Sequence, residues 1–232
     1  MSLAIITASY LRPKILRLFC LSMDRIRKES EFKIDVVCVG DKDHKEMLEK
    51  HNIIFAYKPN HPVSYKFQKA LSIARTLNPK AVMILGSDDI VSTEYVRRAY
   101  KWIEMGEDVV GLSTLYFYST LPDTSGELLR LDKWGRMLGA GKTLSDNLLN
   151  SIDWTLWDAP KNSGLDAMAS KRIPGGGTII DEVLVDVKSK TNINKYSLRK
   201  SKLQNVNPEI FYDILSEEEL NQLKSVINLN II

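Results

Sequence analysis

Two adjacent carboxylates, Asp88 and Asp89, follow a short apolar run at residues 81–85. A run that is apolar on both faces is typical of a central strand in a covered parallel sheet. Two acids at the exit of such a strand repel each other, and a hard divalent cation such as Mg²⁺ or Mn²⁺ relieves that repulsion through oxygen ligands. The cation could also hold a diphosphate. The pair therefore predicts a metal site, and the alternative is a solvated turn before the next helix.

Polar residues also follow two other apolar runs. Four come at or just after the end of the first run: Thr7, Ser9, Tyr10 and Arg12. Asp41 follows the run at 34–39. Ligands of an open α/β sheet bind beyond the carboxyl ends of its strands, so these side chains are expected to meet. Arg12 could pair with phosphate and Asp41 with a base or ribose; the alternatives are a solvated arginine at a helix start and a turn aspartate.

The elements that must position these residues alternate between two periodicities along the first 110 residues. Strand-like runs cover residues 3–8, 34–39, 52–57 and 81–85. Helical spacing of apolar residues begins at Pro13 and recurs over residues 43–51, 67–77 and 93–105. Strands that alternate with helices in this way predict an α/β fold, with a mostly parallel central sheet flanked by helices.

The second half of the chain is less regular. Its composition predicts strands at 108–118, 128–134 and 178–188, and a helix at 144–152. Residues 153–177 are rich in loop-forming residues. Ser216 and Glu219 have the spacing of a capping box, which predicts a final helix to about Ile227.

Composition excludes several classes of protein. A net charge of +3 is too small to indicate nucleic-acid binding by itself, and three histidines, all in the first third, do not suit a multi-histidine zinc site. Cys20 and Cys38 lie in apolar runs, which predicts buried free thiols. No apolar run reaches the roughly 20 residues that a transmembrane helix needs, and the N-terminus lacks a basic leader. We therefore expect a cytoplasmic protein.

Four motifs, in their order and spacing, resemble the GT-A glycosyltransferases of the family 2 type. They are the opening strand and its T-x-x-x-R-P-like turn (5–13), the strand that ends at Asp41 (37–41), a helix similar to K-x-N-x-A-L (66–71) and a D-x-D-like turn (84–89). The resemblance covers roughly residues 3–190. It implies a GT-A (Rossmann-like) transferase domain at 1–190 and a C-terminal basic loop with a helical extension at 191–232.

The resemblance implies a reaction and a set of roles. One sugar would pass from a nucleoside diphosphate-sugar to an acceptor hydroxyl, with inversion and with Mn²⁺ or Mg²⁺ as cofactor. Asp88 and Asp89 would bind the metal. The nucleotide-sugar would lie against Thr7, Ser9, Tyr10, Arg12, Asp41, Lys66, Ser87 and Asp88.

The sequence departs from the family pattern in two places. Gly86 stands where the first aspartate of the metal motif often lies, which puts metal dependence in question. No histidine lies near the C-terminus, where many relatives supply another ligand. Asp186, Asn192 or water could fill that position.

The resemblance also implies a catalytic base on the acceptor side. The segment at 162–167 resembles the family's base-bearing segment, with Asp166 as the group that deprotonates the acceptor hydroxyl. The alternative role for Asp166 is to cap the helix that follows. Asp153 and Asp158 are the competing carboxylates.

Three further features bear on acceptor and phosphate binding. Trp154 and Trp157 could stack on sugar rings or pack the loop onto the sheet. The segment from Lys188 to Lys202 contains six basic residues and no acid. It could close over a diphosphate, attract an anionic acceptor, or be a solvated loop.

The sequence leaves the acceptor open among glycans, lipid-linked molecules and modified nucleic acid, and it does not indicate an oligomeric state. Two other functions compete with glycosyl transfer. A sugar-phosphate nucleotidyltransferase usually has a glycine-rich loop after its first strand, and residues 8–11 contain no glycine. A non-catalytic nucleotide- or carbohydrate-binding module is consistent with Gly86 in the metal motif.

Overall fold

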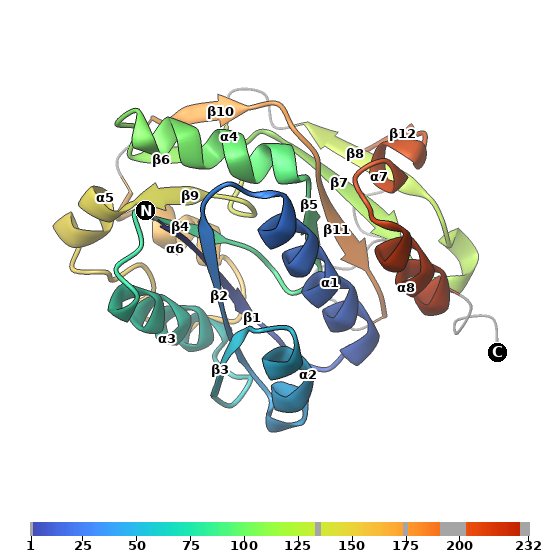
Figure 1. The fold of residues 1–232 in the computed structure, drawn as a ribbon, viewed down its shortest axis with the longest axis horizontal. Helices are drawn as coiled ribbons and strands as arrows, with labels where there is room; N and C mark the ends of the chain where they lie inside the picture. The colour runs from blue at the N-terminus through green and yellow to red at the C-terminus, as the bar shows by residue number, and fades with distance from the viewer. Residues whose placement is uncertain (1, 133–135, 174–175, 191–202, 228–232) are drawn as a thin grey trace.

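The fold comes from a computed structural model, which describes residues 2–132, 136–173, 176–190 and 203–227. Within these ranges, two β-sheets are surrounded by helices (Figure 1). The α-helices are α1 (Pro13–Glu29), α2 (Lys45–Lys50), α3 (Val63–Thr76), α4 (Thr93–Glu104), α5 (Asp146–Ser151), α6 (Leu165–Ser170), α7 (Glu209–Tyr212) and α8 (Glu217–Ile227), with short 3₁₀ turns at Lys42–His44 and Pro122–Thr124.

The larger sheet has seven strands in the order β10-β6-β9-β4-β1-β2-β3. They are β1 (Ser2–Ala8), β2 (Lys33–Gly40), β3 (Ile54–Tyr57), β4 (Ala81–Ile84), β6 (Val109–Leu112), β9 (Thr143–Ser145) and β10 (Thr178–Ile180). Every pairing is parallel except those of β9, which runs antiparallel to β4 and β6. The predicted α/β class with a mostly parallel sheet is confirmed.

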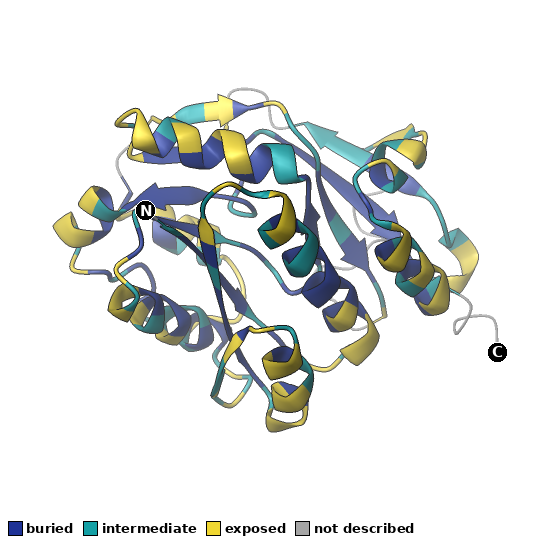
Figure 2. Ribbon diagram, viewed as in Figure 1, coloured by how far each residue is buried: buried dark blue, intermediate teal, exposed yellow. Residues whose placement is uncertain are grey.

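The two faces of this sheet are covered by different helices. Side chains alternate along β1, so Leu3 and Ile5 belong to one hydrophobic cluster and Ala4 and Ile6 to the other. The first cluster includes residues of α1 and α4, and the second includes residues of α3 and α5 (Figure 1). Figure 2 shows the result: the central strands are buried and the outward sides of these helices are exposed.

The smaller sheet has five strands in the order β12-β8-β7-β11-β5. They are β5 (Asp89–Val91), β7 (Thr114–Ser119), β8 (Leu128–Asp132), β11 (Leu184–Lys188) and β12 (Gln204–Val206). The sequence did not predict this sheet. Its strands β7 and β11 are the later parts of the two stretches that were predicted as single strands.

Three sequence predictions are therefore wrong in detail. The stretches 108–118 and 178–188 each contain two strands, and in each stretch the two strands belong to different sheets. The chain can change sheet there because each strand needs only three to six residues to pair. The helix predicted over 144–152 begins at Asp146, because Leu144 pairs with both β4 and β6 as part of β9.

The C-terminal segment packs on the rest of the molecule. Strand β12 pairs with β8, and α8 lies beside α1 (Figure 1). The predicted capping box is confirmed: the Ser216 amide donates to Glu219 Oε2 at 2.7 Å, and the Glu219 amide donates to Ser216 Oγ at 3.2 Å. The basic residues at 191–202 lie outside the described residues, and a domain boundary near residue 190 stays a prediction.

Cys20 and Cys38 are buried and unpaired with each other, as predicted. Across the described parts of the chain, every helix is too short or too polar to cross a bilayer.

Candidate functional site

A cavity of about 580 Å³ opens beyond the carboxyl ends of β1 and β4. This is the edge at which the sequence predicted a binding site. The residues that line it come from both sheets and from the loops around α6. Among the predicted site residues, the lining includes Ser9, Tyr10, Arg12, Ser87, Asp88, Asp89, Trp157, Asp166, Asp186 and Lys188.

Three carboxyl groups converge in this cavity. Oxygen atoms of Asp88, Asp89 and Asp186 lie within 4.8 Å of one another. Asp88 precedes β5, Asp89 begins it, and Asp186 on the antiparallel strand β11 pairs directly with Asp89. The smaller sheet thus brings together acids that are almost 100 residues apart in the sequence.

Burial and mutual repulsion perturb this cluster. Burial, followed by the charges of Asp186 and Asp88, raises the pKa of Asp89 well above its ordinary value. Burial and the charge of Asp88 raise the pKa of Asp186 to about 7, although Lys188 opposes that shift. The neighbouring positive charge of Lys188 therefore does not fully offset the burial and mutual repulsion of the three acids. Among the residues that the structure describes, Asp186 Oδ1 is buried and has no hydrogen-bond partner. A set of carboxylate oxygens suits a hard divalent cation, so the residues fit the metal that the sequence predicted.

Gly86 has a physical reason to lack a side chain. Its amide donates to Asp89 Oδ2 at 2.6 Å. A Cβ atom at this position would lie 2.7 Å from Asp88 Oδ1 and 3.0 Å from Asp89 Oδ2. An aspartate here would collide with the two acids that follow it. The third carboxylate of the cluster comes instead from Asp186.

Two basic side chains border the acids. Arg12 Nη1 donates to Asp88 Oδ2 at 2.7 Å, and Lys188 Nζ donates to Asp186 Oδ2. Arg12 and the preceding Leu11 both have left-handed backbone conformations, with φ of 57° and 50°. This turn separates β1 from α1, whose first residue is Pro13. The chain turns sharply there, so Arg12 lines the cavity and precedes the first turn of α1.

Three predicted nucleotide-binding residues do not line the cavity. Thr7 and Lys66 are buried, and Asp41 lies beside Lys66, with 3.7 Å between Oδ1 and Nζ. Lys66 Nζ donates to the Ser9 carbonyl at 2.7 Å and to Asn60 Oδ1 at 3.3 Å. Burial lowers the pKa of Lys66. Lys66 thus supports the loop after β1, which contributes Ser9 to the cavity wall.

His44 contacts the side chain of Ser9 and was not identified from the sequence as a residue near the site. His44 Nδ1 lies 3.0 Å from Ser9 Oγ, and burial lowers the pKa of the imidazole. His44 follows the second strand by only four residues, so the rule that strand ends converge could have identified it.

Asp166 lies in the first turn of α6 and is exposed to the cavity. The N-cap of this helix is Gly164, so Asp166 does not occupy the capping position. Its carboxyl group rests against Gly139, where an added Cβ would overlap it. The competing acids lie elsewhere: Asp153 pairs with Arg75 at 3.0 Å, and Asp158 pairs with Arg172. Neither lines the cavity.

The two tryptophans have different environments. Trp154 is 5% exposed, donates from Nε1 to Asn150 Oδ1 at 2.9 Å, and does not line the cavity. Trp157 lines the cavity, and its ring centroid lies 5.4 Å from that of Phe67.

A polar group that the sequence did not indicate lies on the same cavity wall. His61 Nδ1 lies 3.0 Å from Asn162 Oδ1, and the same oxygen accepts the Val63 amide at 3.0 Å. His61 lies in the loop after β3, Val63 is the first residue of α3, and Asn162 lies in the loop before α6. Only long-range packing brings them together.

No protein-family model matches the chain, and no curated protein sequence is similar to it. Several solved structures resemble its fold. The bifunctional IspDF from Campylobacter jejuni matches with a TM-score of 0.49 at 15% identity, over 87% of this chain and 53% of that one, so this chain spans about half of that enzyme. The 4-diphosphocytidyl-2C-methyl-D-erythritol synthase from Anaerococcus prevotii matches with a TM-score of 0.46 at 12% identity, over 97% and 96% of the two chains.

A protein from Desulfovibrio desulfuricans, described as a nucleotide-diphospho-sugar transferase, matches with a TM-score of 0.45 at 14% identity, over 99% of this chain and 97% of that one. Likenesses at this level say nothing specific about activity or substrate.

Proposed function

We propose that this protein is a divalent-metal-dependent glycosyltransferase that uses a nucleoside diphosphate-sugar. The supporting observation is the composition of one cavity. An acidic cluster with a deficit of positive charge, two basic side chains and a separate exposed carboxylate all line it. The resemblance of the four sequence motifs to GT-A enzymes of the family 2 type favours sugar transfer over other uses of such a cavity.

Asp88, Asp89 and Asp186 would hold the cation, which when bound neutralises charge on a diphosphate. Arg12 and Lys188 stand beside these acids, where they would pair with phosphate oxygens and hold the leaving group in place. The pairing of β5 with β11 would keep Asp89 and Asp186 at a fixed spacing.

Asp166 would act as the base. The oxygen of the acceptor hydroxyl forms a bond to the anomeric carbon while the bond from that carbon to the diphosphate oxygen breaks. The electron pair leaves with the nucleoside diphosphate, and the hydroxyl proton passes to the Asp166 carboxylate. Attack from the face opposite the leaving group inverts the anomeric centre. Trp157 and Phe67 provide an aromatic wall for the acceptor or the sugar.

The first test is a thermal-shift screen of nucleotide-sugars with and without Mn²⁺, followed by product analysis for the donor that stabilises the protein most. We expect Mn²⁺-dependent release of nucleoside diphosphate. Asp89→Asn should abolish the Mn²⁺-dependent stabilisation. Asp153→Asn is the matched control, because this acid is 84% exposed and lies outside the cavity. If no nucleotide-sugar stabilises the wild-type protein in the presence of Mn²⁺, the proposal is wrong.

The same experiment distinguishes glycosyl transfer from its main alternative, nucleotidyl transfer. Two basic groups beside an acidic cluster would also suit attack on the α-phosphate of a nucleoside triphosphate, as in a sugar-phosphate nucleotidyltransferase. That reaction releases pyrophosphate instead of nucleoside diphosphate. A non-catalytic binding module would bind the nucleotide and release neither product.

A further inference from the structure

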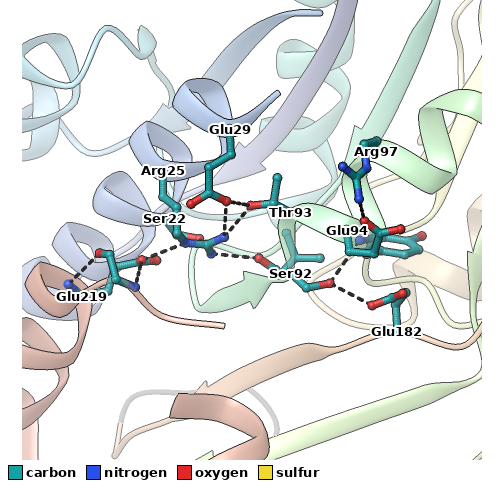
Figure 3. Close-up of polar contacts among 12 residues, drawn as sticks. Ser22, Arg25, Glu29, Ser92, Thr93, Glu94, Arg97, Glu182 and Glu219 are labelled. Atoms are coloured by element: carbon teal, nitrogen blue, oxygen red, sulfur yellow. Dashed lines mark hydrogen bonds and ion pairs between the residues drawn. The ribbon is translucent and has the colours of Figure 1, made fainter. Parts of the chain in front are cut away.

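A single guanidinium joins four segments of the chain (Figure 3). Arg25 lies on α1, and its side chain is 8% exposed. Its Nε donates to Glu219 Oε2 on α8 at 2.8 Å, and its Nη1 donates to Thr93 Oγ1 at the start of α4 at 2.6 Å. Its Nη2 donates to the Val91 carbonyl at 3.0 Å. Val91 is the last residue of β5, the strand that begins with Asp89.

Polar contacts also hold β11, the strand that pairs with β5, at the end that lies beside Val91. The Ser92 amide donates to the Val183 carbonyl at 3.0 Å, and Ser92 Oγ donates to Glu182 Oε2 at 3.3 Å (Figure 3). Arg98 Nη1 adds an ion pair to Glu182 Oε1 at 2.8 Å. Glu182 and Val183 directly precede β11, so polar contacts fix the beginning of β11 and the end of β5 together.

The acids lie at the other end of this short pair of strands. Leu184 pairs with Val91, Val185 with Ile90, and Asp186 with Asp89. Only Ile90 lies between Asp89 and Val91, so the two residues are about 7 Å apart along the extended chain. A paired strand this short transmits a displacement of one end to the other, because each side chain position is fixed by the register.

Glu219 makes the Arg25 contact depend on α8. It is fully buried, and its Oε2 also accepts the Ser216 amide of the capping box at 2.7 Å. The first turn of α8 therefore supplies one of the contacts that hold the guanidinium, in addition to those with Thr93 and Val91. Loss of that contact would leave Arg25 with Ser22 and the exposed Glu29 as its partners on α1.

We propose that Arg25, held by Glu219, is a positioning residue for the acidic cluster, and that α8 sets the cation affinity of a cavity that none of its residues lines. This proposal rests on the metal site of the proposed function. Arg25 acts through the β5–β11 pair, by fixing Val91 and thereby the spacing of Asp89 and Asp186. Tight spacing of these carboxylates is what a divalent cation requires.

The test compares Arg25→Met with Arg27→Met, measured as the Mn²⁺ dissociation constant from the electron paramagnetic resonance signal of free Mn²⁺. Arg27 is a matched control on the same helix. Its guanidinium also donates to backbone carbonyls, but these are those of Ile34 in β2 and of His51 and Asn52 in the turn before β3. Both variants lose stability, so all measurements are made at a temperature at which circular dichroism shows them folded.

We expect Arg25→Met to weaken Mn²⁺ binding about tenfold and Arg27→Met to leave it within twofold of wild type. Glu219→Gln, which keeps the size of the side chain, should weaken binding in the same direction, and it replaces Arg25→Met if that variant does not fold. Equal Mn²⁺ affinity in the Arg25 and Arg27 variants would overturn the proposal, whether both match the wild type or both are weaker.

Amide hydrogen exchange supplies a readout that does not need the metal. Arg25→Met should accelerate exchange of the Ser92 and Val187 amides, which donate across the β5–β11 pair, more than Arg27→Met does. If the wild-type protein does not bind Mn²⁺, the proposed metal site is wrong, and the exchange rates still decide whether Arg25 holds this pair of strands. Equal exchange in the two variants would refute the positioning role.

Discussion

The charge imbalance of the acidic cluster leads to an unusual prediction: removing one of its acids should make the metal-free protein more stable. The change is Asp186→Asn, which keeps the size of the side chain and removes its charge. The pKa of Asp186 rises from 3.8 to about 7 on folding, because of burial and the charge of Asp88. A carboxyl group whose folded pKa is raised contributes stability below its unfolded pKa and loses that contribution as the pH rises through its folded pKa.

The size of the effect follows from that pKa. One pKa unit corresponds to about 1.4 kcal/mol, so the change from 3.8 to about 7 corresponds to roughly 4 kcal/mol at pH 8. The stability of the Asp186→Asn variant relative to wild type should thus be smallest near pH 4 and should increase up to about pH 8. Lys188 does not reverse the sign, because its favourable charge is already present in the raised pKa.

Urea unfolding in EDTA at several pH values between 4 and 8 measures the effect. Mn²⁺ at 100 times its dissociation constant should reduce the difference at pH 8, because it adds about 2.7 kcal/mol to the wild type and less to a variant that lacks one of its ligands. The exposed Asp153→Asn change is the control and should show neither effect. A metal-free Asp186→Asn variant that is less stable than wild type at pH 8 would refute the electrostatic argument.

The other predictions concern the cavity. Asp166→Asn should bind donor normally and turn over about 100-fold more slowly; full activity would assign the base to another residue. Gly139→Ala should also lower the turnover number, because its Cβ displaces the Asp166 carboxyl group, and it should add no further loss in the Asp166→Asn background. Gly86→Ala should weaken Mn²⁺ binding in calorimetry, since its Cβ would crowd two of the acids. Trp157→Phe and Trp154→Phe should each cost roughly 1–3 kcal/mol of stability, but only Trp157→Phe should change substrate KM.

The sequence predicted β1, β2, β3 and β4 of the larger sheet because these strands have strong local signals, whereas β6, β9 and β10 were not predicted as separate strands. The apolar runs of β1 and β4 and the helical spacing of α1 are visible in short windows, and the Ser216 capping box is a local pattern. The smaller sheet has no comparable signal. Residues 178–188 contain neither glycine nor proline, so nothing in their composition marks the point where the chain leaves one sheet for the other.

The same distinction applies to the site. The rule that ligands bind beyond strand ends identified Ser9, Arg12 and Asp88, which lie directly after strands of the larger sheet. Asp186, which the family resemblance gave only as one of three alternatives for a further ligand, joins them through the pairing of β11 with β5, and this pairing depends on tertiary structure. Gly86 was interpreted as a defect of the metal motif, and only the distances to its neighbours show that a side chain does not fit there.

The contact between Arg25 and Glu219 also affects how the protein folds during synthesis. The two residues are separated by 194 positions. At about 5–20 residues per second, a ribosome needs roughly 10–40 s to make the intervening chain. Throughout that interval the guanidinium has no partner from α8, and once β8 has been made its edge stays uncovered until β12 follows. The packing of α8 on α1 can therefore form only after all strands of both sheets in the described chain have been synthesised.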